Sequence, residues 1–523
     1  MSIDTHPSGR AATRIWPGLL GSLSTILGAA WVLIVLFLAL YDLDGYPTTW
    51  FDEGFHLHVP KALVQLGVYA DVSSEGLRYF GATTGVGPTV MLPIAAAFEL
   101  GGIGLLPARL VMVAYLLAAI ALVAAVAGRQ YGRPTAWLAS MLVVSLPALD
   151  LVYLGRQALG EVPALAFLML GFLLWRDGVG RHRRSPARLI WASVAFALAA
   201  LTKNQFSLIL LPTIAALFLV DRLHHRQLRV RDTLLPGLSV LAGVALWYLV
   251  QVLPLLGTED IAAVLVLLRN ASAGAVFVFS TDRMVASLRF LGNPGLFAYW
   301  GLAGLGYGLL LARRRTLDGV FEAFLATFAG IGLAWYAFGS IGWPRYAFPA
   351  LAVTTIFVAK LFRDLLRALQ EADARPRAAG GTFRPTRVVP FVLILALGIG
   401  YPLYHQVQTV LQPPDRSPQA VAAYLEANVP QSLVVETWEP ELATLTDHRY
   451  HYPPTAWLNR AVQAKWLARG PGISGYDPIS EAKPSYLVVG RFGKYSGIYA
   501  GLLGRLSSRP IASFGEYDVY RLK

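Results

Sequence analysis

TTWFDEGFHLH, Thr48 to His58, follows the first long apolar run of the chain and places two adjacent carboxylates, Asp52 and Glu53, where a hydrophobic helix should meet membrane headgroups. The run before it, Trp16 to Leu40, is longer than the apolar core of a signal peptide and has no convincing small-residue cleavage site after it. We therefore expect this run to be retained as a first membrane span that leads into a polar loop.

The composition indicates a polytopic membrane protein. A chain of 523 residues with 55% hydrophobic content, 14% charged residues and a mean hydropathy of +0.53 is too apolar for a soluble protein. The net charge of +13 would favour nucleic-acid binding in a soluble chain, but here the Arg residues cluster in short loops between apolar runs, as cytoplasmic anchors do. The absence of cysteine excludes disulfides, thiolate metal sites and cysteine nucleophiles.

The basic loops predict the topology. Arg10 and Arg14 precede the first span, so we expect the N-terminus in the cytoplasm and residues 48–58 on the extracytoplasmic side. Keeping the later basic loops inside gives about eleven spans. We expect them at 16–40, 105–127, 135–154, 162–176, 189–202, 206–220, 233–255, 294–312, 319–338, 343–361 and 388–404. The remaining apolar run, 85–104, would reverse every later loop if it crossed, so we expect it in the outer interface as an amphipathic or re-entrant helix.

This topology predicts a polytopic α-helical membrane module with juxtamembrane helices over residues 1–404, including a first outer loop at 42–104. Residues 405–523 are expected to form a small extracytoplasmic α/β cap. In this tail we expect a helix at 418–428 and strands at 432–437, near 485–490 and within 509–521.

The Thr48–His58 stretch has a spacing suited to a site. On a helix that begins near Asp52, the side chains of Asp52, Glu53 and His56 can share one patch. The simpler alternative is that the two acids only favour a helix N-terminus through the helix dipole, while neighbouring aromatic residues anchor the interface.

Other outer loops also bring charges to the membrane edge: Arg156, Glu161, Lys203 and Arg345. Such charges are costly at the ends of apolar helices unless they pair or bind something. Lys203 and Arg345 are either snorkelling cations or functional, and the outer location favours function because snorkelling cations belong mainly inside. Arg156 and Glu161 either belong to the functional site or form an ion pair only with each other on one turn.

Carboxylates and cations at an outer membrane edge suit a lipid-borne phosphate and a nucleophilic hydroxyl. A lipid phosphate is a good leaving group whose negative charge must be neutralised, and it needs no proton to leave. Cations such as Lys203 and Arg345 supply this neutralisation. A carboxylate would accept the proton of the attacking hydroxyl. The pattern therefore predicts glycosyl transfer from a polyprenyl-phosphate sugar.

Five sequence elements occur in a characteristic order along the chain. These are FDE after the first span, an Arg followed by LGEVP after the third span, LTK before the sixth span, WPRYAFPALA at the start of a late span, and FGEYDVYRLK at the end of the tail. Over nearly the whole chain this order resembles the GT-C glycosyltransferases, specifically the protein O-mannosyltransferases and the aminoarabinose transferases of lipid A. The resemblance implies an inverting transfer that is metal-independent or weakly metal-assisted, so no cofactor is certain and a divalent metal ion stays open.

The resemblance also implies roles for individual residues. Asp52 becomes the general base, Glu53 its partner in shaping the acceptor site, and Glu161 a second acidic site residue. Substrate-binding residues are expected among His56, Arg156, Lys203, Arg345 and Tyr346. One departure concerns the phosphate lysine: where the lipid A enzymes carry Glu-Lys-Pro-Pro before the second interfacial helix, this chain has TTGVGPTV. The WWD signature of oligosaccharyltransferases is absent as well, which argues against transfer of an oligosaccharide to Asn.

The expected location is the plasma or inner membrane, and the expected partners are a polyprenyl-phosphate sugar donor and a lipid, protein or polysaccharide acceptor. The sugar, the acceptor and the lipid length stay open. Two other classes also use charges in a membrane: a lipid-linked sugar transporter or flippase, and a non-catalytic protein that binds sugar lipids. A transporter should show inverted repeats and charges at the midplane, whereas these charges lie at one edge.

Overall fold

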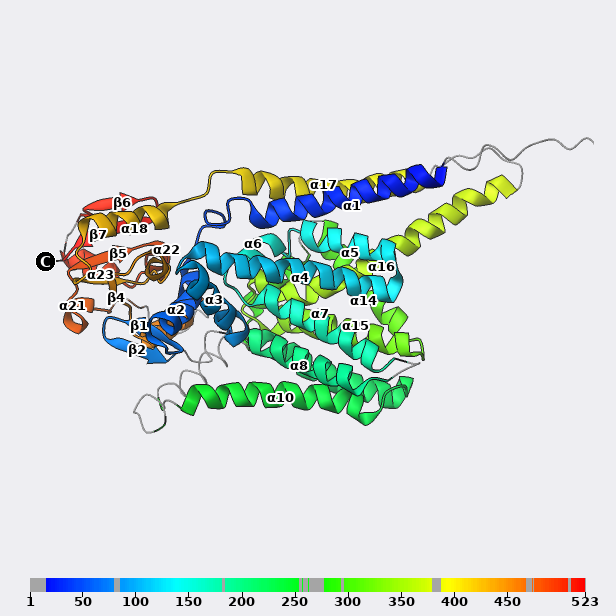
Figure 1. Ribbon diagram of the computed structural model, residues 1–523, viewed down its shortest axis with the longest axis horizontal. Helices are drawn as coiled ribbons and strands as arrows, with labels where there is room; N and C mark the ends of the chain where they lie inside the picture. Colours follow the sequence, from blue (N-terminus) through cyan, green and yellow to red (C-terminus); the bar gives the residue numbers. More distant parts are fainter. Residues whose placement is uncertain are drawn as a thin grey trace, which may run out of the picture.

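The computed structural model describes residues 16–79, 85–180, 184–253, 277–292, 296–378, 387–466, 475–506 and 509–522, together with the single positions 256, 262 and 473. Long helices run side by side in a bundle, and a small domain that contains most of the strands lies at one end of it (Figure 1). This C-terminal domain and the first loop after α1 lie together at the same end.

A helix lies at every predicted span. These helices are α1 (Trp16–Leu40), α4 (Leu105–Tyr131), α5 (Arg133–Ser145), α7 (Glu161–Gly178), α8 (Pro186–Thr202), α9 (Asn204–Val220), α10 (Val230–Val252), α14 (Leu296–Ala312), α15 (Leu317–Gly339), α16 (Pro344–Ala378) and α17 (Val388–Leu411). Among the described residues, five helices are long and apolar enough to cross a membrane, namely α4, α9 with the turn after it, α10, α15 and α17. The predicted polytopic helical membrane fold with a small C-terminal α/β domain is confirmed.

The predicted span 135–154 is interrupted in the structure. Helix α5 ends at Ser145, and a separate short helix, α6 (Leu151–Arg156), follows. Pro147 lies in the break. Inside a helix, proline lacks the N–H that would donate a hydrogen bond, and its ring clashes with the preceding turn. Asp150, just before α6, has a left-handed backbone with φ of 47°. The break turns residues 146–150 into a loop.

Two helices extend beyond their predicted ends. Helix α16 continues past residue 361 to Ala378, and α17 continues past residue 404 to Leu411. The predicted domain boundary between 404 and 405 therefore falls inside α17. Hydropathy marks where a helix leaves the lipid, but polar residues can continue the same helix in water, and the Lys360–Asp364 ion pair at i, i+4 supports that continuation in α16.

The segment between α1 and α4 holds α2 (Phe51–Leu66), a hairpin of β1 (Ala70–Ser73) and β2 (Gly76–Tyr79), and α3 (Pro88–Gly101). Helix α3 lies within the leftover apolar run 85–104 and packs against α2, α4 and α8. Its Ile94 and Phe98 are buried, whereas Leu92 and Leu100 are exposed. In the later loop 256–293, most of which lies outside the described residues, the structure describes α13 (Thr281–Leu291).

The C-terminal domain has a mixed five-stranded sheet in the order β4-β3-β5-β7-β6, in which β3 is parallel to β4 and β5 and the other pairs are antiparallel. Its elements are α18 (Ser417–Asn428), β3 (Val434–Thr437), α19 (Leu442–Leu445), β4 (Arg449–His451), α20 (Thr455–Ala461), α21 (Pro478–Glu481), β5 (Tyr486–Val489), α22 (Arg491–Ser496), α23 (Ala500–Leu506), β6 (Ala512–Phe514) and β7 (Tyr517–Arg521).

The C-terminal domain is docked onto α2. Phe51 of α2 belongs to the apolar core of that domain and stacks on Phe492 with ring centroids 3.9 Å apart. Lys61 Nζ donates to the carbonyl oxygens of Ala443 at 2.6 Å and Thr446 at 3.1 Å. At Gly54, an added Cβ would lie 2.1 Å from the backbone nitrogen of Glu441, so only glycine permits this close approach.

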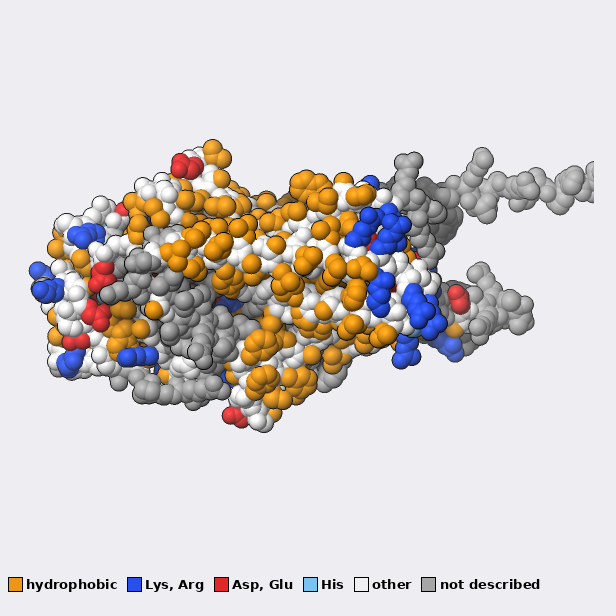
Figure 2. Space-filling view, turned by 90° about the horizontal axis from the view of Figure 1, so that it is seen from below, with side chains coloured by type: hydrophobic (Ala, Val, Ile, Leu, Met, Phe, Trp, Pro, Cys, Tyr) orange, Lys and Arg blue, Asp and Glu red, His pale blue; other side chains and the backbone are white. Residues whose placement is uncertain are grey.

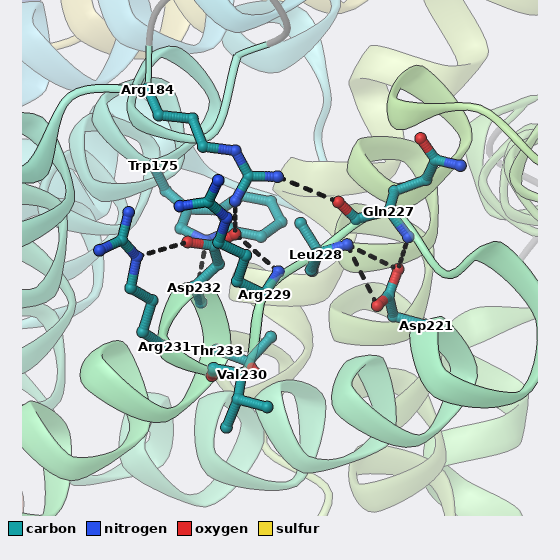
Figure 3. Close-up of polar contacts among 10 residues, drawn as sticks. All are labelled: Trp175, Arg184, Asp221, Gln227, Leu228, Arg229, Val230, Arg231, Asp232 and Thr233. Carbon is teal, nitrogen blue, oxygen red and sulfur yellow. Dashed lines mark hydrogen bonds and ion pairs between the residues drawn. The ribbon is translucent and has the colours of Figure 1, made fainter.

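The opposite end of the bundle is rich in basic side chains. In the face seen in Figure 2, hydrophobic side chains cover the middle of the molecule, and Lys and Arg gather at the end far from the C-terminal domain. A polar network ties two loops together there (Figure 3). Asp232 accepts hydrogen bonds from Arg184 Nη1 at 2.7 Å and from the Arg229 backbone at 2.8 Å, while Trp175 donates to the Asp232 carbonyl.

Candidate active site

Helix α2 presents its two acidic residues in different directions. Both lie in the first helical turn, where negative charge is favoured by the helix dipole. Successive side chains of a helix point about 100° apart, so Asp52 and Glu53 cannot face the same partner. Asp52 faces the start of α16, whereas Glu53 is fully buried against α4.

Asp52 forms an ion pair with Arg345, the second residue of α16. Arg345 Nη1 lies 2.5 Å from Asp52 Oδ2, and both side chains are partly exposed. The guanidinium also lies over the ring of Trp343, 4.7 Å from its centroid, and over Trp50 at 5.8 Å. Aromatic faces and one carboxylate therefore hold the planar cation in place.

A second ion pair joins Glu161 to Lys203. Lys203 Nζ lies 3.1 Å from Glu161 Oε1, with side-chain exposures of 8% and 0%. Glu161 is the first residue of α7, and Lys203 is an extended residue between α8 and α9. This buried pair is fixed at the ends of three helices.

The backbone around Lys203 is fixed by the segment that enters α3. Val86 and Lys203 form an antiparallel bridge, and the Gly87 N–H donates to the Thr202 carbonyl at 3.1 Å. A Cβ at Gly87 would lie 1.8 Å from the Leu201 carbonyl oxygen, so the contact requires glycine. The TTGVGPTV element, which departs from the lipid A enzymes, thus supports the lysine of the LTK element.

The two ion pairs lie close enough to affect each other. Burial raises the pKa of Asp52, but the charges of Arg345, His56 and Lys203 together lower it by more, so it stays below its usual value. Asp52, on a loop helix outside the spanning segments, is therefore ionised at neutral pH. Tyr346 feels the charges of Arg345, Glu161 and Asp52 and stacks on Trp335 at 5.5 Å, so it belongs to the same cluster.

His56 lies beside this cluster as a neutral side chain. Its Nδ1 lies 2.7 Å from the Ala158 carbonyl oxygen, so Nδ1 carries the proton and the lone pair is on Nε2. Burial, followed by the charge of Lys203, lowers the pKa of His56 to about 4. At neutral pH it cannot neutralise a phosphate by its own charge.

Glu53 and Arg156 lie apart from the cluster. Arg109 of α4 donates to both oxygens of Glu53, at 2.9 and 2.5 Å, and to the Leu43 carbonyl at 2.9 Å, with both side chains fully buried. Arg156 donates to the carbonyls of Leu38 and Tyr41 at the end of α1. Arg156 and Glu161 do not form the ion pair considered above, because Glu161 pairs with Lys203.

A cavity of about 700 Å³ lies between the bundle and the C-terminal domain, and Asp52 and Arg345 line it. The α5–α6 loop with Asp150 forms another wall. From the C-terminal domain, the lining includes Glu439, Glu441 and the first turn of α22. In the described part of the chain, no group of three or more His, Asp or Glu side chains is arranged to hold a metal ion.

Several of these residues are absent from the predicted site. Arg109 carries a detectable signal, because a charge inside an apolar run of α4 is costly without a partner. Glu439 and Glu441 carry none, since acidic residues are ordinary in a water-exposed domain. Only the docking of that domain onto α2 brings them to the cavity.

The fold can be compared with known proteins. The structure of ArnT from Cupriavidus metallidurans bound to undecaprenyl phosphate matches with a TM-score of 0.62 and 15% identity, over 95% of this chain and 97% of that chain. The same protein in the apo state matches with a TM-score of 0.63 and 15% identity, over 96% and 98%. The apo oligosaccharyltransferase of Archaeoglobus fulgidus gives 0.56 and 15%, over 94% of this chain and 71% of that chain.

The chain has the GT-C fold. A family model described as dolichyl-phosphate-mannose-protein mannosyltransferase matches residues 86–251, which covers α3 to α10 and contains the Glu161–Lys203 pair. No curated protein sequence gives a significant match. The predicted resemblance to the GT-C superfamily is therefore confirmed at the level of the fold.

Proposed function

We propose that this GT-C protein is a membrane glycosyltransferase that moves a single sugar from a polyprenyl-phosphate donor to an acceptor hydroxyl. The observation that carries the proposal is the cluster of two ion pairs, Asp52–Arg345 and Glu161–Lys203, of which the first opens into a cavity at the end of the bundle. The ArnT structure of the same fold, which holds undecaprenyl phosphate, supports a lipid phosphate as the donor carrier.

We expect Arg345 to exchange its carboxylate partner, Asp52, for the phosphate of the donor. A donor phosphate competes with Asp52 for Arg345, because a guanidinium binds phosphate and carboxylate oxygens in the same two-pronged geometry. Donor binding thereby releases the Asp52 carboxylate. Arg345 and Lys203 then stabilise the negative charge that develops on the leaving phosphate.

In the transfer step, the acceptor oxygen attacks the anomeric carbon of the sugar, and the bond from that carbon to the phosphate oxygen breaks with its electron pair. Asp52 accepts the proton of the acceptor hydroxyl as general base. A single displacement from the face opposite the phosphate inverts the anomeric configuration. The products are the glycosylated acceptor and polyprenyl phosphate.

The donor site can be tested by substitution of its two cations. Lys203→Ala and Arg345→Ala are each expected to weaken binding of a short-chain polyprenyl phosphate by about 10- to 100-fold, because each removes a charge-assisted contact. The loss of binding free energy in the double variant should be smaller than the sum of the losses in the two single variants, since both groups act on one ligand charge. Arg345→Lys should rescue only part of the loss, because an ammonium lacks the planar fork.

Affinity would be measured in detergent, with Lys360→Ala as the control. Lys360 is also a cation in an ion pair, but its partner is Asp364 on the same helix, α16. Unchanged affinity in both single Ala variants, with folding intact, would show that the phosphate is held elsewhere.

We further propose that the C-terminal domain is extracytoplasmic and that the protein resides in the plasma or inner membrane. The gathering of Lys and Arg at the opposite end supports this orientation (Figure 2). The cysteine-free chain permits a direct test with two exposed alanines, Ala427 in α18 and Ala368 near the end of α16. Ala427→Cys should react with an impermeant maleimide in intact cells, and Ala368→Cys only after permeabilisation. The reverse pattern would refute the orientation.

A further inference from the structure

The wall of the cavity that the C-terminal domain supplies carries two neighbouring carboxyls with unequal surroundings. Glu439 accepts hydrogen bonds from the backbone N–H groups of Gly490, Phe492 and Gly493, at 3.0, 3.2 and 2.8 Å. Glu441 accepts one, from Tyr517 Oη at 2.6 Å. Its other oxygen, Oε2, accepts no hydrogen bond from the described residues although the side chain is 1% exposed and lines the cavity.

The position of this wall is fixed relative to Asp52. The backbone of Pro440 and Glu441 rests directly on Gly54, two residues after Asp52 on the same helix. His58 Nε2 lies 3.0 Å from the Pro440 carbonyl oxygen. A molecule bound to Glu441 is therefore held at a constant place with respect to the proposed base.

The α5–α6 loop supplies a third carboxylate. Asp150 lines the same cavity, and its side chain makes neither a capping hydrogen bond nor an ion pair with the described residues. Its backbone is left-handed, with φ of 47°, a conformation that Asp adopts more readily than most residues other than glycine.

The charges that line the cavity do not balance. Asp52 pairs with Arg345, and Asp415 lies 3.8 Å from Arg491. Glu439 accepts hydrogen bonds from backbone N–H groups, and among the described residues neither Glu441 nor Asp150 forms an ion pair. Burial and the neighbouring Glu441 raise the pKa of Glu439 well above its usual value, and burial raises the pKa of Glu441 to about 7, so this carboxyl pair retains part of a proton at neutral pH. With Arg345 taken by the donor phosphate, an anionic acceptor would lose hydration and meet these carboxyls in the remaining space.

The same space also has aromatic walls. The rings of Phe290, Trp343, Phe492 and Tyr495 all line the cavity. A volume of about 700 Å³ lies within the range for binding sites of small molecules. Ring faces combined with hydrogen-bond acceptors match a saccharide, which has an apolar ring face and many hydroxyls that can donate. A polypeptide would bring as many carbonyl acceptors as N–H donors.

We propose that Glu441 and Asp150 form the acceptor subsite of this cavity and that the acceptor is an uncharged saccharide whose hydroxyls bind these two carboxyls. This inference rests on the proposed function and adds the chemical class of the acceptor. The subsite places an acceptor hydroxyl next to Asp52 and disfavours acceptors that carry phosphate or carboxylate groups.

Two matched probes test the charge preference: hexyl β-D-glucopyranoside and hexyl β-D-glucuronide, which differ by one carboxylate. Binding to the full-length protein in lipid nanodiscs would be followed by quenching of tryptophan fluorescence, since Trp50 and Trp343 line the cavity. The neutral probe is expected to bind at least about 10-fold more tightly than the anionic one. Glu441→Gln and Asp150→Asn should each reduce this ratio several-fold, whereas Glu426→Gln, an exposed acid on α18, should leave it unchanged.

Equal binding of the two probes, or a ratio unchanged in both cavity variants, would overturn the subsite. A parallel incubation of the protein and native membranes with the radiolabelled polyprenyl-phosphate sugar that the wild type consumes examines the product. Label in a protease-resistant glycan supports the inference, and label in a protease-sensitive product overturns the saccharide assignment. Because probe binding needs no donor, loss of the charge preference is distinguishable from failure of the glycosyltransferase function, which would appear as absence of donor consumption by the wild type.

Discussion

Asp52→Asn is expected to lower turnover of the polyprenyl-phosphate sugar by about 10²–10⁴-fold, the usual effect of removing a general base. Asn keeps the volume of the side chain but cannot accept the proton of the acceptor hydroxyl. Donor binding should persist or become tighter, because Arg345 no longer has a carboxylate that competes with the phosphate. The measurement is the initial rate of polyprenyl phosphate release by the purified variant at saturating donor.

Asp44→Asn is a suitable control, since Asp44 is an exposed acid between α1 and α2 that lies 3.8 Å from Arg416. This control should retain full turnover. Wild-type turnover in the Asp52→Asn variant would end the assignment of Asp52 as the base.

Arg109→Leu is expected to destabilise the protein by about 3–5 kcal/mol, because it leaves the Glu53 carboxylate buried without its partner. Both side chains of this pair are fully buried, so water cannot replace the lost contacts. The measurement is denaturant unfolding in detergent followed by tryptophan fluorescence.

The double variant Glu53→Met/Arg109→Leu provides the matched control. With both charges replaced by apolar side chains of similar size, no buried charge is left unpaired, and most of the lost stability should return. If Arg109→Leu unfolds like the wild type, the buried pair does not stabilise the fold and the structural role of Glu53 is refuted.

The sequence predicted the helical architecture well because apolar runs and basic loops report directly on the lipid and its two surfaces. Each expected span contains a helix, and the leftover run 85–104 contains α3. The break at 146–150 carried a local signal in Pro147, but hydropathy alone did not reveal it. The extension of α17 beyond residue 404 carried no such signal, because a helix can continue into water without a change in hydropathy that marks its end.

The candidate site was predictable as a set of residues but not as a set of contacts. Asp52, Glu161, Lys203 and Arg345 do gather, as expected for charges at one edge of the bundle. The sequence left open whether the two cations pair with acids or bind a ligand, and in the structure each forms an ion pair. Which acid meets which cation depends on how helices far apart in sequence pack, and no local pattern encodes that.

Glu53 illustrates a second limit of sequence patterns. Its adjacency to Asp52 suggested a shared role, yet neighbouring side chains on a helix diverge, and Glu53 points to Arg109. The cavity wall at Glu439 and Glu441 could not be predicted from local sequence either. It depends on the close contact at Gly54 that brings the C-terminal domain onto α2.

The central claim is tested most directly by incubation of the purified protein in nanodiscs with a panel of radiolabelled polyprenyl-phosphate sugars and a membrane extract that supplies acceptors. The account predicts that the wild type converts at least one donor to free polyprenyl phosphate and transfers the sugar with inverted anomeric configuration, and that Asp52→Asn does not. Intact donors throughout, accompanied by movement of the sugar lipid across a bilayer or by binding alone, would contradict it and favour a transporter or a binding protein.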